Sequence, residues 1–414
     1  MKKTILIVYF LSFFLSACLL ETKTENVSIS TEKKLTLMIY MAADNDLEKY
    51  ALANLRAMEQ TFHEGVNVIA LIDRAEGYDE TDGNWTDTRL FEVIYDAGND
   101  KAIKSKQLNC PQLGLSVSES TELDMADSSV LKAFVNYAMT EYKAENYALI
   151  IWGHGAGWRG ATIDDRSDTY MSLNQLGKAL GVGVQKLSVI GFDTCFGGVM
   201  ENLYELKDCS DYIVACPGVT PGSGWDYSKL LKMLTSEDIT PQRIALCMTE
   251  SSAVSTSLFE NKEIADFYIA FENFSHQLAD KIIDSQSQRT IFDSLNNCKS
   301  YYYSQNPCDI YIDINSLANL FIADSDYDVR NTAQNLISQI KKICPSNQIE
   351  IGNIGIHYIP KTASGALASV HAFDYVKTSN NTSQCKFVKE SQWWVPTEDG
   401  NSGSLLDKLF YTSF

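Results

Sequence analysis

The chain has 414 residues, 45% of them hydrophobic and only 8 of them proline, a composition typical of a globular protein that buries a large core. Its 53 acidic residues outnumber 34 basic ones, and the resulting formal net charge of −19 argues against nucleic acid or another polyanion as a partner.

The first residues have the features of an export signal. Lys2 and Lys3 precede an apolar run over residues 5–15, too short to cross a bilayer comfortably, and a Leu-Ser-Ala-Cys sequence ends at Cys18. This sequence resembles the lipobox of bacterial lipoproteins, in which the cysteine is acylated. We expect residues 1–17 to be a signal peptide and Cys18 a lipid anchor that holds the exported protein to a membrane, in the periplasm or at the cell surface. An ordinary cleaved signal peptide is the alternative.

Short apolar runs alternate with amphipathic stretches beyond a polar tether over residues 18–34, as in an α/β sheet. Helical spacing behind Asp127, and again after Cys195, predicts crossover helices between parallel strands. We place this α/β core in residues 35–260. Nearly continuous apolar runs predict strands buried on both faces at residues 35–41, 66–72, 147–152, 187–192 and 212–216.

The alternation of apolar runs and amphipathic stretches is less regular over residues 261–414. Helices are predicted around 264–283 and 329–343, and a strand at 354–359. We interpret this region as a helical and β extension packed on the core, with a separate small domain as the alternative.

Ten cysteines are compatible with disulfides in an exported chain, and Cys298 with Cys308 is the candidate local pair. No CxxC pair is present in the sequence, which argues against structural zinc.

Two predicted strands end in a reactive side chain beside glycines. His154 lies in WGHGAGW and Cys195 in GFDTCFGG, and their separation of 41 positions leaves room for one crossover helix. Because ligands of open parallel sheets bind at the carboxyl ends of strands, both side chains can face one crevice.

A thiolate attacks carbonyl carbons, and a neighbouring imidazole can hold it ionised or protonate the leaving amine. We interpret Cys195 as the nucleophile and His154 as its acid/base partner. The backbone N–H groups of Gly155 and Cys195 are candidate donors to the oxyanion. A helix predicted to begin near Gly197 would favour the thiolate through its dipole. An inert buried cysteine and a turn histidine are the alternatives.

The two strings YALIIWGHGAGW (147–158) and VIGFDTCFGGVMENLYEL (189–206) resemble the active-site blocks of the clostripain family, cysteine peptidases of the caspase-like clan. The resemblance implies a caspase-like, mostly parallel α/β fold, a His–Cys dyad without an obligatory third member, and hydrolysis of peptide bonds after Arg or Lys. Further stretches agree in the family's order: LMIYMAADNDLE (37–48), VIALIDRAEG (68–77), PGSGWDY (221–227) and GIHYIP (355–360).

By position in these blocks, His154 and Cys195 match the dyad, and Asp193 matches the acid of the specificity pocket. In an extended segment Asp193 faces the same side as Cys195, where its carboxylate can pair with a guanidinium or an ammonium. A cap or turn residue is the alternative. Trp225 is a candidate pocket wall or a core residue. Ser223 stands where some relatives carry an acid, so the choice between Arg and Lys stays open.

Relatives are often zymogens that cut themselves after a basic residue between the His and the Cys. Arg166 is the only basic residue of the polar segment 162–169, so we expect self-cleavage after Arg166 and a nicked two-chain form. Lys178 is the second candidate, and a plain surface loop is the alternative.

No cofactor or metal is predicted, although calcium supports some family members and stays an open question. Asp164, Asp165 and Asp168 do not match an EF-hand loop, which needs alternating ligands, a central glycine and a terminal glutamate. Monomer is the default expectation. Two functions compete with peptide hydrolysis. One is that of a catalytically silent surface lipoprotein that binds peptide or glycan, and the other is another thiol-based acyl transfer.

Overall fold

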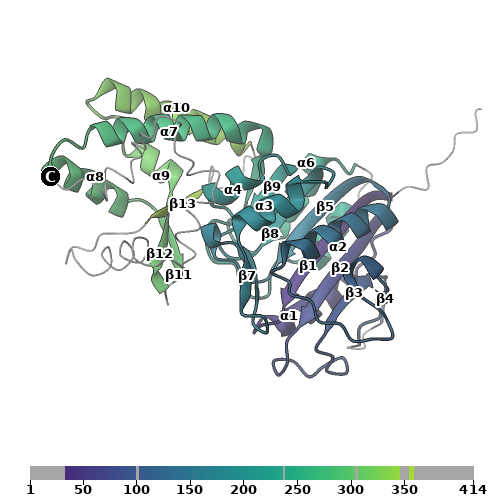
Figure 1. The fold of residues 1–414 in the computed structure, drawn as a ribbon. Helices are drawn as coiled ribbons and strands as arrows, with labels where there is room; N and C mark the ends of the chain where they lie inside the picture. Colours follow the sequence, from purple (N-terminus) through teal and green to yellow (C-terminus); the bar gives the residue numbers. More distant parts are fainter. Residues whose placement is uncertain (1–32, 99–101, 236–237, 304–305, 346–353, 359–414) are drawn as a thin grey trace, which may run out of the picture. The chain divides into compact units, whose positions relative to one another are not determined.

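The computed structural model describes residues 33–98, 102–235, 238–303, 306–345 and 354–358. The expected signal peptide, Cys18 and the last 56 residues therefore lie outside the described part of the chain. An eight-stranded sheet forms the centre of the fold, in the order β10-β9-β8-β5-β1-β2-β3-β4 (Figure 1). Its strands are β1 (Lys33–Ala43), β2 (Val66–Arg74), β3 (Thr88–Glu92), β4 (Lys106–Leu108), β5 (Ala144–Trp152), β8 (Leu187–Asp193), β9 (Ser210–Ala215) and β10 (Ser257–Glu260).

The five middle strands β9, β8, β5, β1 and β2 run parallel, and a helix precedes each of them except β1, the first described element. They are the five nearly continuous apolar runs of the sequence, since helices cover both of their faces. The prediction of a mostly parallel α/β sheet is confirmed. The antiparallel edge strands β3, β4 and β10 were not predicted, because each is short.

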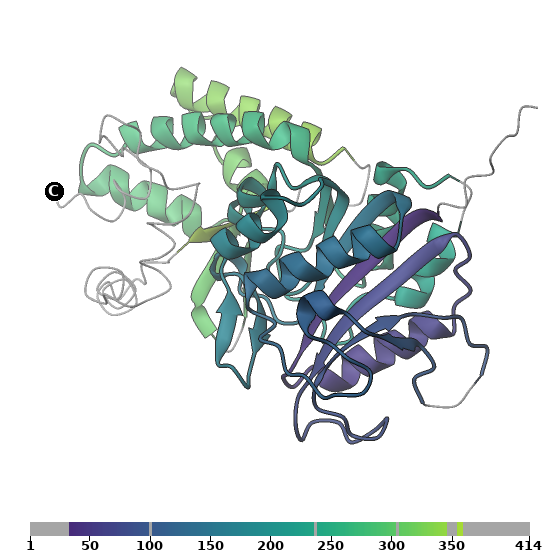
Figure 2. The same cartoon turned by 45° about the vertical axis from the view of Figure 1, so that its right-hand side comes forward.

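Successive residues of β1 point to opposite sides of the sheet and into two separate cores. Met38 and Tyr40 pack with α2, α3 and α4, whereas Leu37 and Ile39 pack with α1, α5 and α6. Figure 2 shows α2 and α3 in front of the strands. The helices are α1 (Glu48–Glu59), α2 (Ser128–Glu141), α3 (Leu173–Gly181), α4 (Met200–Leu206), α5 (Tyr227–Leu234) and α6 (Pro241–Ser251), with 3₁₀ turns at Pro111–Leu113 and Gly157–Arg159.

The chain beyond β10 adds helices and a small antiparallel sheet. Helices α7 and α10 pack on each other and share a hydrophobic core with α4. None of the described helices is long and apolar enough to cross a membrane. The elements are a 3₁₀ turn (Asn261–Glu263), α7 (Ile264–Asp280), α8 (Ser285–Asn296), β11 (Ser300–Tyr303), β12 (Asn306–Asp313), α9 (Ile314–Asn319), α10 (Tyr327–Ile343) and β13 (Gly355–Tyr358).

Two boundary predictions need correction. The first strand begins at Lys33, so the tether is shorter than residues 18–34. Helix α4 begins at Met200 rather than near Gly197, because Asn202 donates to the Gly197 carbonyl and holds the intervening turn in a non-helical form. Cys195 therefore lies outside the first turn of the helix, and its dipole cannot be invoked for the thiol.

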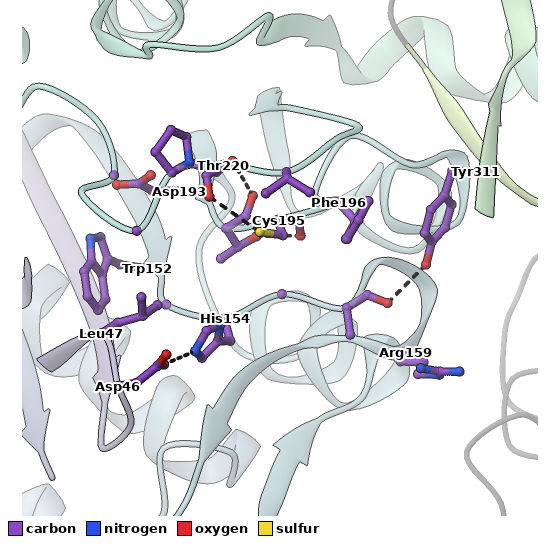
Figure 3. Close-up of a pocket in the computed structure, with 18 residues that line it drawn as sticks. Asp46, Leu47, Trp152, His154, Arg159, Asp193, Cys195, Phe196, Thr220 and Tyr311 are labelled. Carbon is purple, nitrogen blue, oxygen red and sulfur yellow. Dashed lines mark hydrogen bonds and ion pairs between the residues drawn. The ribbon is translucent and has the colours of Figure 1, made fainter. Parts of the chain in front are cut away.

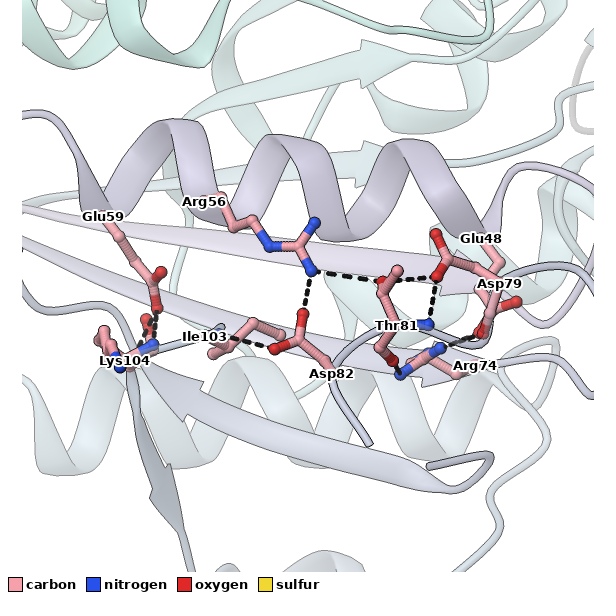
Figure 4. A network of polar contacts seen from close by, with 10 residues as sticks. Glu48, Arg56, Glu59, Arg74, Asp79, Thr81, Asp82, Ile103 and Lys104 are labelled. Atoms are coloured by element: carbon pink, nitrogen blue, oxygen red, sulfur yellow. Dashed lines mark hydrogen bonds and ion pairs between the residues drawn. The ribbon is translucent and has the colours of Figure 1, made fainter. Parts of the chain in front are cut away.

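A buried ion pair joins α1 to the end of β2. The guanidinium of Arg74 donates to the Glu48 carboxylate and to the carbonyl oxygens of Asp79 and Thr81 (Figure 4). Both side chains of the pair are 0% exposed, and burial raises the pKa of Glu48. The Arg74 guanidinium also lies over the Trp85 ring, with its carbon 4.6 Å from the ring centroid. This network fixes the start of α1 directly after the loop that follows β1.

We expect Glu48→Ala to lower the free energy of unfolding by about 3–5 kcal/mol, because it leaves the Arg74 guanidinium charged and buried without its partner. Chemical denaturation of the purified chain measures this loss. The exposed pair Lys34–Glu145 is the matched control, and Glu145→Ala should cost no more than about 1 kcal/mol. A Glu48→Leu, Arg74→Met double variant should recover most of the loss; equal instability of the double and single variants would contradict the argument.

Candidate active site

The carboxyl ends of four parallel strands meet around one cavity of about 510 Å³. His154 follows β5, Cys195 follows β8, and both line the cavity together with Asp46, which follows β1 (Figure 3). The segment after β9 closes another wall with Thr220. The two strand ends identified in the sequence therefore do face one crevice.

Gly155 allows the histidine loop to lie directly on the cysteine loop. A Cβ atom at this position would stand 2.4 Å from the Cys195 carbonyl oxygen and 2.7 Å from the Thr194 hydroxyl. Any side chain would push the two loops apart. The backbone N–H groups of Gly155 and Cys195 donate to no recorded partner within the described residues, and both residues line the cavity.

Cys195 is a partly buried thiol. Its Sγ lies 3.6 Å from the Thr220 carbonyl oxygen, to which the S–H donates. Burial raises the pKa of the Cys195 thiol and the Asp193 carboxylate adds to the rise, while contact with the Thr220 backbone opposes it. The thiol is therefore neutral in this arrangement, and it becomes a nucleophile only when a base takes its proton.

His154 has a carboxylate partner that the sequence interpretation did not assign. Its Nε2 lies 2.7 Å from Oδ1 of Asp46, 108 positions earlier in the chain (Figure 3). Asp46 is exposed and His154 about one-third exposed, so the contact is made at the mouth of the cavity. With Nε2 engaged, Nδ1 is the nitrogen left to exchange protons with a thiol or a substrate.

Asp193 is the last residue of β8 and is only 3% exposed, yet it lines the cavity. Its Oδ2 accepts hydrogen bonds from the Trp225 backbone N–H and the Tyr227 hydroxyl, each at 3.0 Å. Oδ1 has no hydrogen-bond partner in the described part of the chain. Burial raises the pKa of Asp193 to about 7, although the two hydrogen bonds act to lower it. The site thus holds a buried carboxyl group with one free acceptor oxygen.

The Trp225 ring packs against Gly191 in the core beneath β8 and does not line the described cavity. The sequence left Trp225 as either a pocket wall or a core residue, and in the structure it is a core residue. Trp225 contributes its backbone N–H to Asp193 instead. Gly224, in a left-handed conformation with φ +67°, lets this turn approach, because a Cβ there would lie 2.5 Å from the Asp193 carboxylate.

Tyr311 of β12 brings the C-terminal region into the cavity wall. Its hydroxyl donates to the Ala156 carbonyl oxygen at 3.1 Å and accepts from the Trp158 N–H at 3.3 Å (Figure 3). Its ring stacks on Phe196, next to Cys195, with centroids 5.2 Å apart. Tyr311 therefore braces the histidine loop and the cysteine loop together.

Arg166 lies at the tip of a hairpin formed by β6 (Ala161–Asp164) and β7 (Thr169–Met171). Its guanidinium pairs with Glu122 and does not line the cavity. Lys178 is exposed on α3, where a peptide bond is held in helical form. Cys298 is a buried free thiol, and the side chain of Cys308 lies outside the described residues.

The cavity thus brings together a thiol and an imidazole at adjacent strand ends, with a buried carboxyl group beside them, the groups that a cysteine hydrolase uses. The chain belongs to the clostripain family, a family of cysteine peptidases (C11), whose model matches residues 39–394. It is similar to clostripain of Hathewaya histolytica, with 26% identity over 233 residues that make up 50% of this chain and 43% of clostripain. The chain thus matches less than half the length of that relative.

Solved structures agree on the fold. An inactive zymogen C11 protease from Parabacteroides distasonis is similar at 16% identity and a TM-score of 0.63, covering 88% of this chain and 99% of that protein. A secreted C11 cysteine protease from Bacteroides thetaiotaomicron, solved with an irreversible peptide inhibitor, is similar at 15% identity and a TM-score of 0.57, covering 87% and 99%. At these identities the likeness establishes the caspase-like fold.

We expect Asp46→Ala and Asp46→Asn to lower kcat/KM for peptide hydrolysis roughly 10- to 100-fold, because both remove the carboxylate that orients the His154 ring. Two fluorogenic peptides, one with Arg and one with Ala directly before the reporter group, distinguish a role of Asp46 in orienting His154 from a role in substrate specificity. A positioning role lowers the rate with both peptides by the same factor. A loss confined to the Arg peptide would instead make Asp46 a contact of the substrate's basic side chain.

Proposed function

We propose that this protein is a cysteine endopeptidase that hydrolyses peptide bonds after basic residues, with Cys195 and His154 as its catalytic dyad. The observation that carries this proposal is the Asp193 carboxyl group, buried with one unpaired oxygen in the cavity that His154 and Cys195 also line. The peptide inhibitor bound to a solved relative of the same fold supports a polypeptide substrate.

The proposed reaction begins when the Cys195 thiol gives its proton to His154 and the sulfur attacks the scissile carbonyl carbon. We assign the oxyanion that forms to the Gly155 and Cys195 N–H groups, which donate to no acceptor within the described part of the chain. The C–N bond then breaks as His154 returns the proton to the leaving amine. Water, deprotonated by His154, hydrolyses the thioester and restores the thiol. Asp46 keeps the imidazole oriented through Nε2.

Selectivity for Arg or Lys follows from the electrostatics of Asp193. An unpaired carboxylate oxygen in a buried site favours a guanidinium or ammonium, since a charged pair there is far stronger than in water. Ser223 adds no second acid to this wall, so the selectivity rests on one carboxylate. We therefore expect the enzyme to accept both Arg and Lys.

Self-cleavage after Arg166 is part of the proposal. The β6–β7 turn is exposed and its backbone is not helical, so it can be drawn out as an extended substrate, unlike the bond after Lys178 within α3. Arg166 lies outside the cavity in the intact chain. Release from Glu122 must therefore precede cleavage, whether in the same molecule or by another copy. The zymogen among the relatives is in keeping with such a step.

The location that we propose is outside the cytoplasm, in the periplasm or at the cell surface, with lipid on Cys18 as the membrane anchor. The charged, apolar and small-residue segments up to Cys18 support this, as does the secreted relative. Fatty-acid labelling that is lost in Cys18→Ala would support the anchor; unlabelled wild type would oppose it.

Asp193→Asn should abolish the preference for an Arg peptide over an Ala peptide while leaving slow cleavage of the Ala peptide. In the wild type this preference should fall about tenfold between pH 8 and pH 6, because a carboxyl group with a pKa of about 7 becomes protonated and neutral below that pH. The ratio of the two kcat/KM values is the quantity to measure, since ionisation of Cys195 and His154 cancels in it. Cys195→Ala is the inactive control.

A preference that is independent of pH, or that survives in Asp193→Asn, would remove Asp193 from the specificity site. If the folded, reduced wild type cleaves none of the peptides, the silent peptide- or glycan-binding lipoprotein becomes the better interpretation.

Purified wild type should appear as two chains whose junction follows Arg166, because the exposed turn presents the required basic residue. Arg166→Ala and Cys195→Ala should stay intact, and Lys178→Ala should be cut like the wild type. Intact mass spectrometry and N-terminal sequencing locate the cut. An Arg166→Ala protein that is still nicked within the β6–β7 turn would refute this processing site.

A further inference from the structure

One charged residue of the cavity wall has no part in the proposed reaction. Arg159 is the only lysine or arginine among the residues that the structure describes as lining the cavity. A guanidinium keeps its positive charge throughout the pH range in which proteins work, and its planar fork matches a carboxylate. The chain as a whole has a formal net charge of −19, so this positive charge stands out in an acidic protein. Arg159 can therefore select for a negative group in whatever binds to the cavity.

The turn that presents Arg159 is fixed at both ends. Arg159 is the last residue of the 3₁₀ turn Gly157–Arg159, and the residue directly before this turn, Ala156, accepts from the Tyr311 hydroxyl through its carbonyl. Directly after the turn, Gly160 has φ +126°, and a Cβ there would lie 1.9 Å from a carbonyl oxygen of β7. The backbone therefore packs tightly on both sides of the turn, and it presents Arg159 to the cavity in one place.

Arg159 and Asp193 lie on opposite sides of the proposed dyad. In Figure 3 Cys195 lies between them, and Arg159 is at the end of the cavity near Tyr311. In the proposed reaction the basic side chain of the substrate enters toward Asp193, and His154 gives its proton to the leaving amine. The segment that leaves with this amine must pass His154, and the histidine loop leads from His154 to Arg159 in five positions. Arg159 is therefore on the side of the leaving segment.

We propose that Arg159 is a second specificity residue, which binds an acidic side chain at the second position after the scissile bond. The inference rests on the proposed peptidase function and deepens it. Side chains of an extended substrate alternate between two faces. The residue directly after the bond therefore points away from the wall that receives the basic side chain, and the next residue points back to it. There a carboxylate and the Arg159 guanidinium can form two parallel hydrogen bonds. The substrate class is a peptide with a basic residue before the bond and an acidic residue second after it.

The proposed processing segment of this chain has the same arrangement. Ser167 and Asp168 follow Arg166, so an acid stands second after the bond that we expect to be cut. Asp168 is exposed at the tip of the hairpin, where it can be drawn out together with Arg166. Two acids also precede Arg166, and the sequence by itself favours neither side. The position of Arg159 on the histidine loop is what favours the acid on the leaving side.

The test uses internally quenched peptides that are amidated at the C-terminus and contain Arg-Ser-Asp, Arg-Ser-Asn or Arg-Ser-Lys in one common sequence. Wild type should cleave after Arg in all three, with kcat/KM for the Asp peptide at least about threefold above that for Asn and about tenfold above that for Lys, because the charge pair is attractive in one and repulsive in the other. Product masses confirm the position of the cut.

Substitution of Arg159 should change this order of preference. Arg159→Gln should bring the ratio of the Asp and Lys peptides close to one, Arg159→Glu should invert it, and Arg159→Lys should keep part of it, since the charge remains but the fork is lost. The ratio does not respond to a general loss of activity. Arg289→Gln, which removes an exposed guanidinium of α8, is the matched control and should keep the wild-type ratio. High salt should lower the wild-type ratio toward one, a readout that needs no variant.

Three results would each overturn the role of Arg159: a wild type that does not discriminate among the peptides, an Asp preference that survives in Arg159→Gln, or a stronger preference for an acid before the Arg than after the Ser. A preference for a peptide that ends in Ser-Asn with a free carboxylate over the Ser-Asp peptide would assign the guanidinium to a chain terminus and would also overturn it. Wild type that cleaves the Arg reporter peptide but fails in these ways retains the proposed function. Failure to cleave any peptide refutes both.

Discussion

The arrangement of the site depends on the loop that follows the central strand β1. Three consecutive side chains leave it in different directions: the Asp44 carboxylate lies within 4.8 Å of those of Asp73 and Glu122, Asn45 donates to the Ala42 and Ile163 carbonyls, and Asp46 accepts from His154. Because β1 lies in the middle of the sheet, this loop touches both His154 and the β6–β7 hairpin. The buried Glu48–Arg74 pair holds its far end. The Asp165 N–H of the hairpin donates to the Asp44 carbonyl, and His154 contacts Asp46. The hairpin and the imidazole are therefore bound to residues only two positions apart.

The loops that carry His154 and Cys195 are held together by Tyr311 of the C-terminal region as well as by the sheet. Tyr311 spans from the Ala156 carbonyl to the Phe196 ring, and a Cβ at Gly157 would occupy the position of its hydroxyl. Tyr311 thus completes the wall of the cavity from the C-terminal region. The same region also shares a hydrophobic core with α4, so it supports the sheet as well as the two loops that carry His154 and Cys195.

Much of the fold was predictable from the sequence, because strands buried on both faces leave continuous apolar runs whose ends carry His154 and Cys195. The partners of these residues were less accessible. Asp46 lies in a stretch that had been identified as a family block, but nothing local says that it meets His154, 108 positions away. Tyr311 comes from a region of weak periodicity. The helix start near Gly197 was wrong because the turn held by Asn202 has no distinctive local signal.

The carboxyl groups of Glu48, Glu122 and Asp193 differ in burial and in whether a guanidinium group pairs with them. Arg74 and Glu48 are both 0% exposed, so their pair is permanent and structural. Arg166 and Glu122 remain 44% and 31% exposed, so their pair can open. Asp193 is buried, and its Oδ1 has no hydrogen-bond partner in the described part of the chain. The three carboxyl groups therefore differ in what their surroundings allow: Glu48 holds a fixed ion pair, Glu122 holds a pair that can open, and Asp193 keeps one acceptor oxygen unpaired in the cavity wall.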